Sequence, residues 1–186
     1  MAKHRVCPWW MGYLLANPLR KLRQNPARIL SPHVRAGMTV LEPGPGMGFF
    51  TLEIARLVGP SGRVVAVDVQ PRMIEALQRR ARKGGLLGRI DARAVSAASM
   101  ELDGLDGSFD FVLAFAVVHE LPSAANFFRE AARAMKTGAS LLLAEPGGHI
   151  DEAEFAQEIA AAADAGLSVI DRPSLKGSVA ALLRKS

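Results

Sequence analysis

Beyond Gly37 the chain alternates short apolar runs with longer segments in which apolar residues recur at helical spacing. The short runs are typical of strands that are covered on both faces. Strands that alternate with helices predict an α/β domain built on a mostly parallel sheet. The expected strands are residues 38–41, 63–69, 90–95, 109–115, 140–144, 167–171 and 179–183.

The helix boundaries are marked by residues with known capping preferences. Pro71 suits the first position of a helix, and Gly84 and Gly85 would end it. Ser123 can cap a later helix, which Gly138 is expected to end. The expected helices are residues 49–58, 71–83, 124–137 and 152–165.

Composition narrows the class of protein. The 186 residues, 49% hydrophobic and 22% charged, suit one globular domain. Cys7 is the only cysteine, which excludes an internal disulfide and a cysteine-rich metal site, so no metal is expected. No apolar run approaches the roughly 20 residues that a membrane span needs. The expectation is a reduced, cytoplasmic protein without a transmembrane segment.

Positive charge is concentrated at the N-terminus. Residues 1–41 contain seven lysines and arginines and no acidic residue, whereas the whole chain has a net charge of +5. Trp9, Trp10 and Tyr13 lie in the same segment. Such a segment either binds nucleic acid or an anionic membrane surface, or forms a helical cap that packs its aromatic side chains on the main domain. The expected division is a cap segment, residues 1–35, and a main domain, residues 36–186.

A glycine-rich loop connects the first expected strand to the first expected helix. Glycines let the backbone turn sharply and let a ligand approach main-chain N–H groups, and the helix start offers unpaired donors. This arrangement is typical of a nucleotide-binding corner. Gly44, Gly46 and Gly48 depart from the dinucleotide pattern G-x-G-x-x-G, because Phe49 stands where its third glycine would fall.

Two acidic residues define the ligand further. Glu42 precedes the loop and would repel a diphosphate but attract an ammonium group. Asp68 lies near the end of the second expected strand, 24 residues after Gly44, where a carboxylate can accept both hydroxyls of a ribose; its alternative role is a helix cap. The expected ligand is a nucleoside that carries an ammonium and a carboxylate group and no phosphates.

Four segments, taken in order, form a recognisable set. They are E-P-G-P-G-M-G, V-V-A-V-D-V-Q-P-R-M-I, S-F-D-F-V-L-A-F-A-V-V-H-E-L and K-T-G-A-S-L-L-L-A-E-P. The set resembles the glycine-loop, ribose-binding, fourth-strand and fifth-strand motifs of class I S-adenosylmethionine-dependent methyltransferases. The resemblance covers about residues 36–186. It implies a Rossmann-like fold: a doubly wound, mostly parallel seven-stranded sheet with helices on both faces.

The resemblance also implies a cofactor and its contacts. S-Adenosyl-L-methionine would be the methyl donor and S-adenosyl-L-homocysteine the product. Glu42 and the glycine loop would hold the methionine end, and Asp68 the ribose. The other implied cofactor-binding residues are Met47 in the loop, Val69 and Met73 along the adenine, Ser96 and Ala97 at its edge, and Ala114 and Phe115 after the fourth strand. Ser96 departs from the acidic residue of many members, and Met73 and Phe115 have the alternative role of core residues.

The catalytic and acceptor residues are a separate question. A general base is needed only if the acceptor carries a proton at neutral pH, and His119 is the candidate because imidazole titrates near neutrality. Its alternative role is to shape the pocket, for which His149 is a second candidate. Trp9, Trp10 and Tyr13 are expected to cover the pocket and contact a small-molecule acceptor.

Two other functions remain open at this point. One is an RNA- or membrane-associated methyltransferase that uses the basic N-terminal arm. The other is a non-catalytic S-adenosylmethionine-binding protein. A dehydrogenase is disfavoured because Phe49 breaks the dinucleotide pattern.

Overall fold

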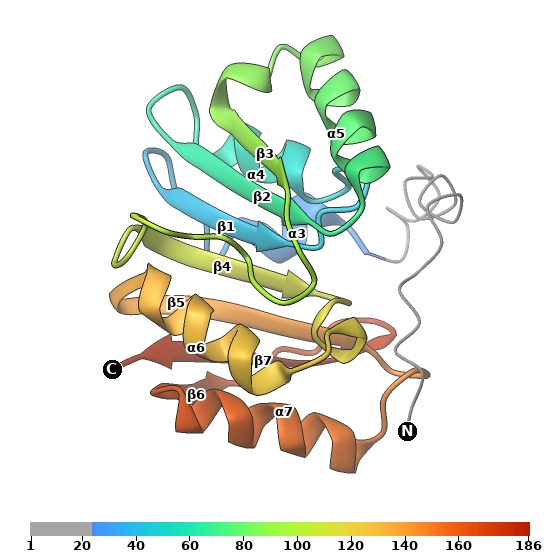
Figure 1. Ribbon diagram of the computed structural model, residues 1–186, viewed down its shortest axis with the longest axis vertical. Helices are drawn as coiled ribbons and strands as arrows, with labels where there is room; N and C mark the ends of the chain where they lie inside the picture. The colour runs from blue at the N-terminus through green and yellow to red at the C-terminus, as the bar shows by residue number, and fades with distance from the viewer. Residues whose placement is uncertain (1–23) are drawn as a thin grey trace. The chain divides into compact units, whose positions relative to one another are not determined.

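The computed structural model describes residues 24–186, which contain seven strands and the helices between them (Figure 1). These residues fall into two compact units, 24–96 and 97–186. Most of the predicted cap segment lies outside the described residues, as do Trp9, Trp10 and Tyr13. Within residues 24–186, no helix combines the length and the apolar character that crossing a membrane requires.

The unit 24–96 consists of α3 (Pro26–Leu30), β1 (Thr39–Pro43), α4 (Thr51–Leu57), β2 (Arg63–Asp68), α5 (Pro71–Lys83), a 3₁₀ turn (Leu87–Arg89) and β3 (Ile90–Ala94). Its strands are parallel in the order β3-β2-β1. The connections from β1 to β2 and from β2 to β3 both move toward the same edge of the sheet. Right-handed crossovers therefore place α4 and α5 on one face of these strands. Val40, Leu41, Val64 and Val65 are fully buried, which explains the apolar runs in the sequence.

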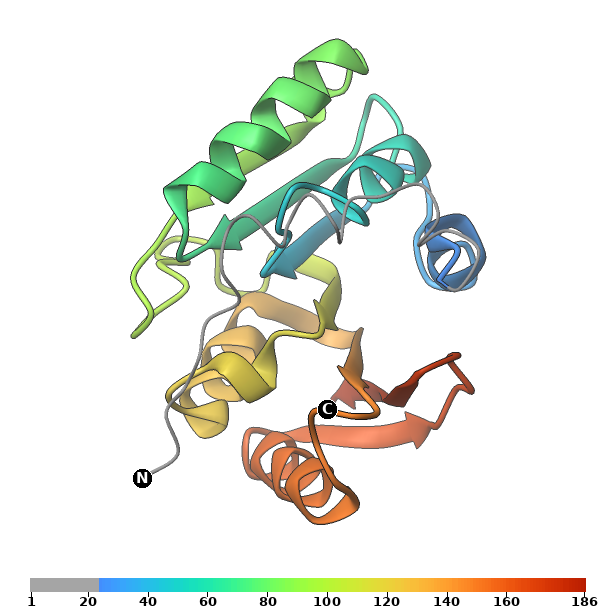
Figure 2. The same cartoon turned by 90° about the vertical axis from the view of Figure 1, so that its right-hand side faces the viewer.

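The unit 97–186 consists of β4 (Phe109–Phe115), a 3₁₀ turn (Val118–Glu120), α6 (Ala124–Ala134), β5 (Met135–Pro146), α7 (Glu152–Asp164), β6 (Leu167–Asp171) and β7 (Ser178–Lys185). Its strands follow the order β4-β5-β7-β6, with β4 and β5 parallel and β7 antiparallel to both neighbours. Helix α7 packs beside α6 (Figures 1 and 2). A capping box begins α7, since the side chains of Asp151 and Glu154 each accept the other's backbone N–H.

The boundary between α6 and β5 differs from the prediction. Helix α6 ends at Ala134, and Gly138, the expected helix stop, lies inside β5 with a φ of +78°. The reason is sheet pairing: Met135 already pairs with Phe109, and the register then shifts so that Phe111 pairs with Ser140. This long-range pairing overrides the local helix signal.

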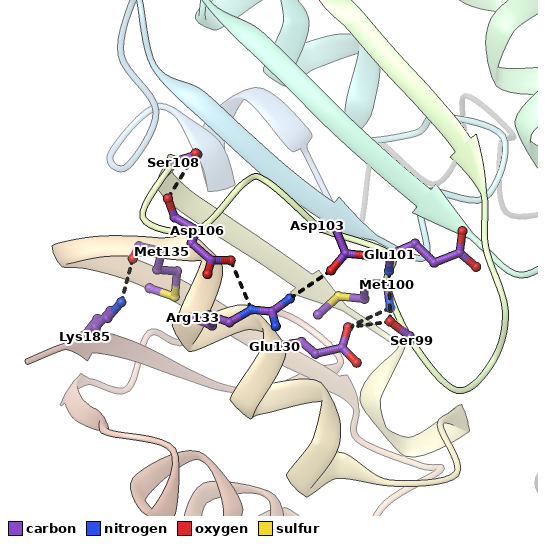
Figure 3. A network of polar contacts seen from close by, with 10 residues as sticks. All are labelled: Ser99, Met100, Glu101, Asp103, Asp106, Ser108, Glu130, Arg133, Met135 and Lys185. Atoms are coloured by element: carbon purple, nitrogen blue, oxygen red, sulfur yellow. Dashed lines mark hydrogen bonds and ion pairs between the residues drawn. The ribbon is translucent and has the colours of Figure 1, made fainter.

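The segment that follows β3 is held by α6 through side-chain hydrogen bonds (Figure 3). Glu130 Oε2 accepts hydrogen bonds from the Met100 N–H at 2.7 Å and from the Ser99 hydroxyl at 3.2 Å. Asn126 Nδ2 donates to the Ala98 carbonyl at 2.9 Å and to Glu130 Oε1 at 2.8 Å. The loop after β3 therefore has a defined backbone path.

Candidate active site

The glycine loop has a backbone that only glycine adopts readily. Gly44, Gly46 and Gly48 have φ values of +66°, +54° and +84°, all in the left-handed region. At Gly48 the need is also steric, because a Cβ would lie 2.4 Å from Leu77 Cδ1 of α5. At Gly46 a Cβ would meet nothing within 4 Å. The loop thus packs tightly against α5 at its end and has open space beside Gly46.

Asp68 is joined to this loop by hydrogen bonds. Its carboxylate, 7% exposed at the end of β2, accepts the Gly46 N–H on Oδ2 at 3.2 Å and the Gln70 N–H on Oδ1 at 2.8 Å. Burial raises the pKa of Asp68, and these two N–H donors oppose the rise. Each oxygen retains acceptor capacity, so the carboxylate can also receive two hydroxyls of a ribose.

Glu42 is a buried acid without a full set of partners. It is 3% exposed, and its Oε2 has no hydrogen-bond partner; the Thr51 hydroxyl is likewise buried and unpartnered. Burial raises the pKa of Glu42 to about 8; the nearby Thr51 lowers it, and the charge of Asp68 raises it further. A cationic ligand group would relieve this arrangement, whereas a diphosphate would worsen it. The carboxylates of Glu42 and Asp68 therefore fit an amino-acid-bearing nucleoside.

The other predicted cofactor residues of this unit lie at the same end of β1 and β2. Met47 and Met73 form one buried apolar cluster with Ala76, which suits the core role named as the alternative for Met73. Val69 is partly buried beside Asp68, and Ser96 is exposed. Ala97 is also exposed and begins the other unit.

Sequence reasoning missed Arg80 of α5, which holds the backbone of the glycine loop at Met47. Its guanidinium Nη1 donates to the Met47 carbonyl at 2.5 Å, and burial lowers the pKa of this arginine. Arg80 follows Leu77 by three positions on α5, so both side chains face the loop. That helical spacing is the signal that could have identified it.

A second group of polar residues lies in the unit 97–186. His119 follows β4, and its Nδ1 lies 2.5 Å from Oε2 of Glu145 at the end of β5. Glu145 is fully buried, and its Oε1 accepts the Val118 N–H at 2.8 Å. The hydrogen bond to Glu145 raises the pKa of His119, against the opposing effect of burial. His149 contributes an exposed ring whose centroid is 6.0 Å from that of His119.

Glu145 and Glu158 were not predicted as site residues. Glu145 directly follows the apolar run of residues 141–144, which is a usable signal. Its partnership with His119 depends on β4 and β5 being neighbours. Glu158 on α7 is 7% exposed, and its Oε2 is buried without a partner. Burial raises the pKa of Glu158 to about 8, and the charge of Glu145 adds to the rise. No group of three or more metal-binding side chains is arranged for an ion in the described part of the chain.

The end of β4 carries the last predicted cofactor residues. Ala114 and Phe115 are buried, with exposed fractions of 0% and 8%. The next residue, Ala116, has a φ of +55° and donates its N–H to the Ala144 carbonyl at 2.7 Å. The chain therefore turns sharply at the carboxyl end of β4, directly before the segment that carries His119.

Comparisons with solved structures define the fold class. A crystal structure of a SAM-dependent methyltransferase from Aquifex aeolicus superimposes with a TM-score of 0.84 and 23% identity, covering 96% of this chain and all of that one. The [4+2]-cyclase SpnF superimposes with a TM-score of 0.72 and 18% identity, covering 89% of this chain and 80% of that one. The predicted fold class is confirmed: the chain has the seven-stranded, mostly parallel, doubly wound methyltransferase fold.

The fold and the glycine loop together define a class I S-adenosylmethionine-dependent methyltransferase, as the sequence motifs indicated. The chain belongs to the methyltransferase domain family, whose profile matches residues 35–178.

Curated relatives include enzymes of quinone biosynthesis. The ubiquinone/menaquinone biosynthesis C-methyltransferase UbiE of Pasteurella multocida is 30% identical over 112 residues, which are 60% of this chain and 41% of that protein. A ubiquinone biosynthesis O-methyltransferase of Methylocella silvestris is 34% identical over 130 residues, which are 69% of this chain and 48% of that protein. The matches thus span less than half the length of these two relatives.

Proposed function

We propose that this chain binds S-adenosyl-L-methionine and transfers its methyl group to a small-molecule acceptor by direct displacement. The observation that carries the proposal is the paired acid arrangement at the glycine loop. Asp68, fixed by the Gly46 N–H, would receive the ribose hydroxyls. Glu42, with its unpartnered buried oxygen, would face the ammonium group. Ser96 and Ala97 would border the adenine, and Ala114 and Phe115 would lie beside the cofactor.

The bound cofactor supplies an electrophilic methyl group on a sulfonium centre. The protein's own contribution is to hold the acceptor atom about 3–3.5 Å from that methyl group and to exclude water. Both of the compared quinone-pathway relatives carry names that refer to small molecules, which supports a small-molecule acceptor. Trp9, Trp10, Tyr13 and His149 stay proposed acceptor contacts. A cytoplasmic location is also proposed, because a single cysteine suits a reducing compartment.

The test compares two carboxylate substitutions in the same unit. Asp68→Asn should weaken binding of S-adenosylhomocysteine about ten- to a hundredfold, because charge-assisted hydrogen bonds contribute roughly 1.5–3 kcal/mol. Glu75→Gln, which changes an exposed acid on α5 paired only at 3.8 Å with Arg79, should leave the affinity unchanged. Isothermal titration calorimetry measures both, with NAD as a second ligand. Tight binding of NAD, or equal affinities in the two variants, would refute the proposed cofactor site.

Two alternatives have specific observations in their favour. The basic residues of the segment 1–41 favour an RNA- or membrane-associated acceptor, which predicts binding that weakens steeply with salt. The cyclase SpnF shares the fold and has a name that refers to a reaction other than methyl transfer, so the fold is compatible with a chain that binds the cofactor without methyl transfer. A labelled-methyl screen against a cell extract distinguishes the alternatives, because the non-catalytic chain would label nothing.

A further inference from the structure

Charge is divided unequally between the two units of the chain. Residues 24–96 contain eleven lysines and arginines and five acidic residues, whereas residues 97–186 contain seven lysines and arginines and thirteen acidic residues. Their formal net charges are therefore +6 and −6. Of the eleven basic residues in the unit 24–96, only Arg28 and Arg35 belong to the basic N-terminal segment 1–41. The other nine are a separate accumulation of positive charge.

The acidic residues of the unit 24–96 do little to neutralise its surface. Glu42 and Asp68 are buried, and Glu53 and Asp91 form ion pairs with arginines at 2.9 and 2.5 Å. Glu75 is the remaining acid, and it lies 3.8 Å from an arginine of its own helix with both side chains more than 60% exposed. Such an exposed pair is weak. The surface of this unit is thus more basic than its composition alone indicates.

Helix α5 collects these basic side chains on one exposed face. Its apolar residues, among them Met73 and Leu77, are buried where the helix packs along β2 and β3 (Figures 1 and 2). Positions 72, 79 and 83 are spaced by two turns and one turn, so they lie in a row on the opposite side of the helix.

The α5 basic face comprises this row and the two charged residues beside it. Its members, all exposed, are Arg72, Glu75, Arg79, Arg82 and Lys83. At 1.5 Å per residue the row extends about 16 Å along the helix axis. The face carries four positive charges and one negative charge.

The helix dipole accounts for only part of this charge. Basic residues in the last turn of a helix are favourable, which suits Arg82 and Lys83. Arg72 lies in the first turn, where the dipole disfavours a cation, and no acidic residue accompanies it there. Helix stability therefore does not explain the row as a whole.

The side chains on and near this face indicate the kind of partner. Three of its four cations are arginines, whose planar guanidinium groups bind phosphate oxygens with paired hydrogen bonds. Within residues 24–186 the large exposed apolar side chains are Val169 and Ile170, both in the other unit. The α5 basic face thus lacks the apolar side chains with which an amphipathic helix enters a membrane surface.

Aromatic residues distinguish single-stranded from duplex nucleic acid. Proteins that bind single strands stack the unpaired bases on exposed aromatic rings. The unit 24–96 contains no tryptophan or tyrosine, and of its two phenylalanines Phe50 is buried and Phe49 is half-buried. A duplex presents its phosphates outward and keeps its bases stacked inside, so it needs cations and no stacking platform.

We propose that the α5 basic face docks the phosphate backbone of a nucleic-acid duplex, without reading its base sequence. This inference does not rest on the proposed function, because the face contains none of the proposed cofactor or acceptor contacts. Phosphate contacts release counterions, so each one adds about 0.9 to the steepness with which log K falls against log salt concentration.

The test measures binding of the full chain to short duplex RNA and duplex DNA of unrelated sequences by fluorescence anisotropy over a range of salt concentrations. Wild type should bind both duplexes, whatever their sequence. The triple variant Arg79→Gln, Arg82→Gln and Lys83→Gln should weaken binding about tenfold or more at low salt. It should also reduce the salt dependence by roughly 2–3 in the slope of log K against log salt concentration.

A matched variant removes the same charge from the other unit. Arg129→Gln, Arg172→Gln and Lys176→Gln change three exposed positions of residues 97–186 and should leave the salt slope unaltered. Glu75→Gln, which removes the one acid of the α5 basic face, should strengthen binding severalfold. A gain in affinity cannot come from loss of folding, so this variant keeps the test informative even if the triple variant on α5 is unstable.

Three results would overturn the proposal. Equal effects of the two triple variants would show that binding depends on net charge or on the segment 1–41. Tighter binding of single strands than of duplexes would indicate base stacking outside the α5 basic face. Binding to vesicles of phosphatidylserine and phosphatidylcholine that the α5 triple variant abolishes, with no binding of either duplex, would make the partner an anionic membrane surface.

Discussion

At the scale of single residues, the described part of the chain holds carboxyl groups in surroundings that favour their neutral form. Glu42 and Glu158 are both nearly inaccessible, and each has a buried oxygen without a partner. Such groups cost stability when they ionise. A ligand or a proton can remove that cost, so these residues make the stability of the fold depend on ligand binding and on pH.

Glu42 makes a prediction about stability and pH. The pKa of Glu42 is about 8 in the folded chain and near the ordinary glutamate value of 4.5 in the unfolded chain, so the folded state binds the proton more tightly. Stability should therefore decline as pH rises from about 5 to about 8. Glu42→Gln should flatten this decline, whereas exposed Glu75→Gln should not. Thermal unfolding at a series of pH values measures both, and parallel curves for wild type and Glu42→Gln would contradict the prediction.

At the scale of elements, helix α6 and the loop after β3 are joined by two kinds of interaction (Figure 3). Glu130 accepts hydrogen bonds from Ser99 and from the backbone of the buried Met100. Arg133 forms ion pairs with Asp103 at 3.8 Å and Asp106 at 3.1 Å, but these side chains are 50%, 98% and 63% exposed. Solvent screening makes exposed pairs weak, so Glu130 should dominate the anchoring.

Truncating the two α6 side chains tests this ranking. Glu130→Ala should cost about 1–3 kcal/mol, because it leaves the Met100 N–H without its acceptor, and should accelerate amide exchange at Met100. Arg133→Ala should cost less than about 1 kcal/mol. Denaturant unfolding and hydrogen exchange provide the measurements. A larger loss from Arg133→Ala would show that the exposed ion pairs are the principal anchor.

The sequence predicted the order of elements well because strand and helix periodicities are local signals. It also located the glycine loop, whose spacing reflects backbone angles that few other residues adopt. It did not predict that β5 begins at Met135, since that depends on pairing with Phe109. For the same reason the bond between His119 and Glu145 was not foreseen. Glu158 gave no signal, because a glutamate on a helix is usually solvated.

At the scale of the whole molecule, binding of the cofactor product should raise the thermal stability of the chain. At a concentration one hundred times its Kd, S-adenosylhomocysteine should add about 2.7 kcal/mol, which for a chain of this size raises Tm by roughly 5–10 °C. NAD at the same concentration should produce no shift. Differential scanning fluorimetry measures this, with Asp68→Asn as the control that should lose most of the shift. An unchanged Tm with S-adenosylhomocysteine would contradict the assigned cofactor.

Strand β5 lies between two neighbours of opposite direction. Parallel β4 borders it on one side, and on the other β7 runs antiparallel, with Val179 opposite Glu145. The final strand pairs its backbone with β5, and so keeps water from one edge of the strand that carries Glu145, the hydrogen-bond partner of His119. Breaking the backbone ladder at Val179, for example with proline, would therefore change imidazole basicity at a distance, without touching any ionisable group.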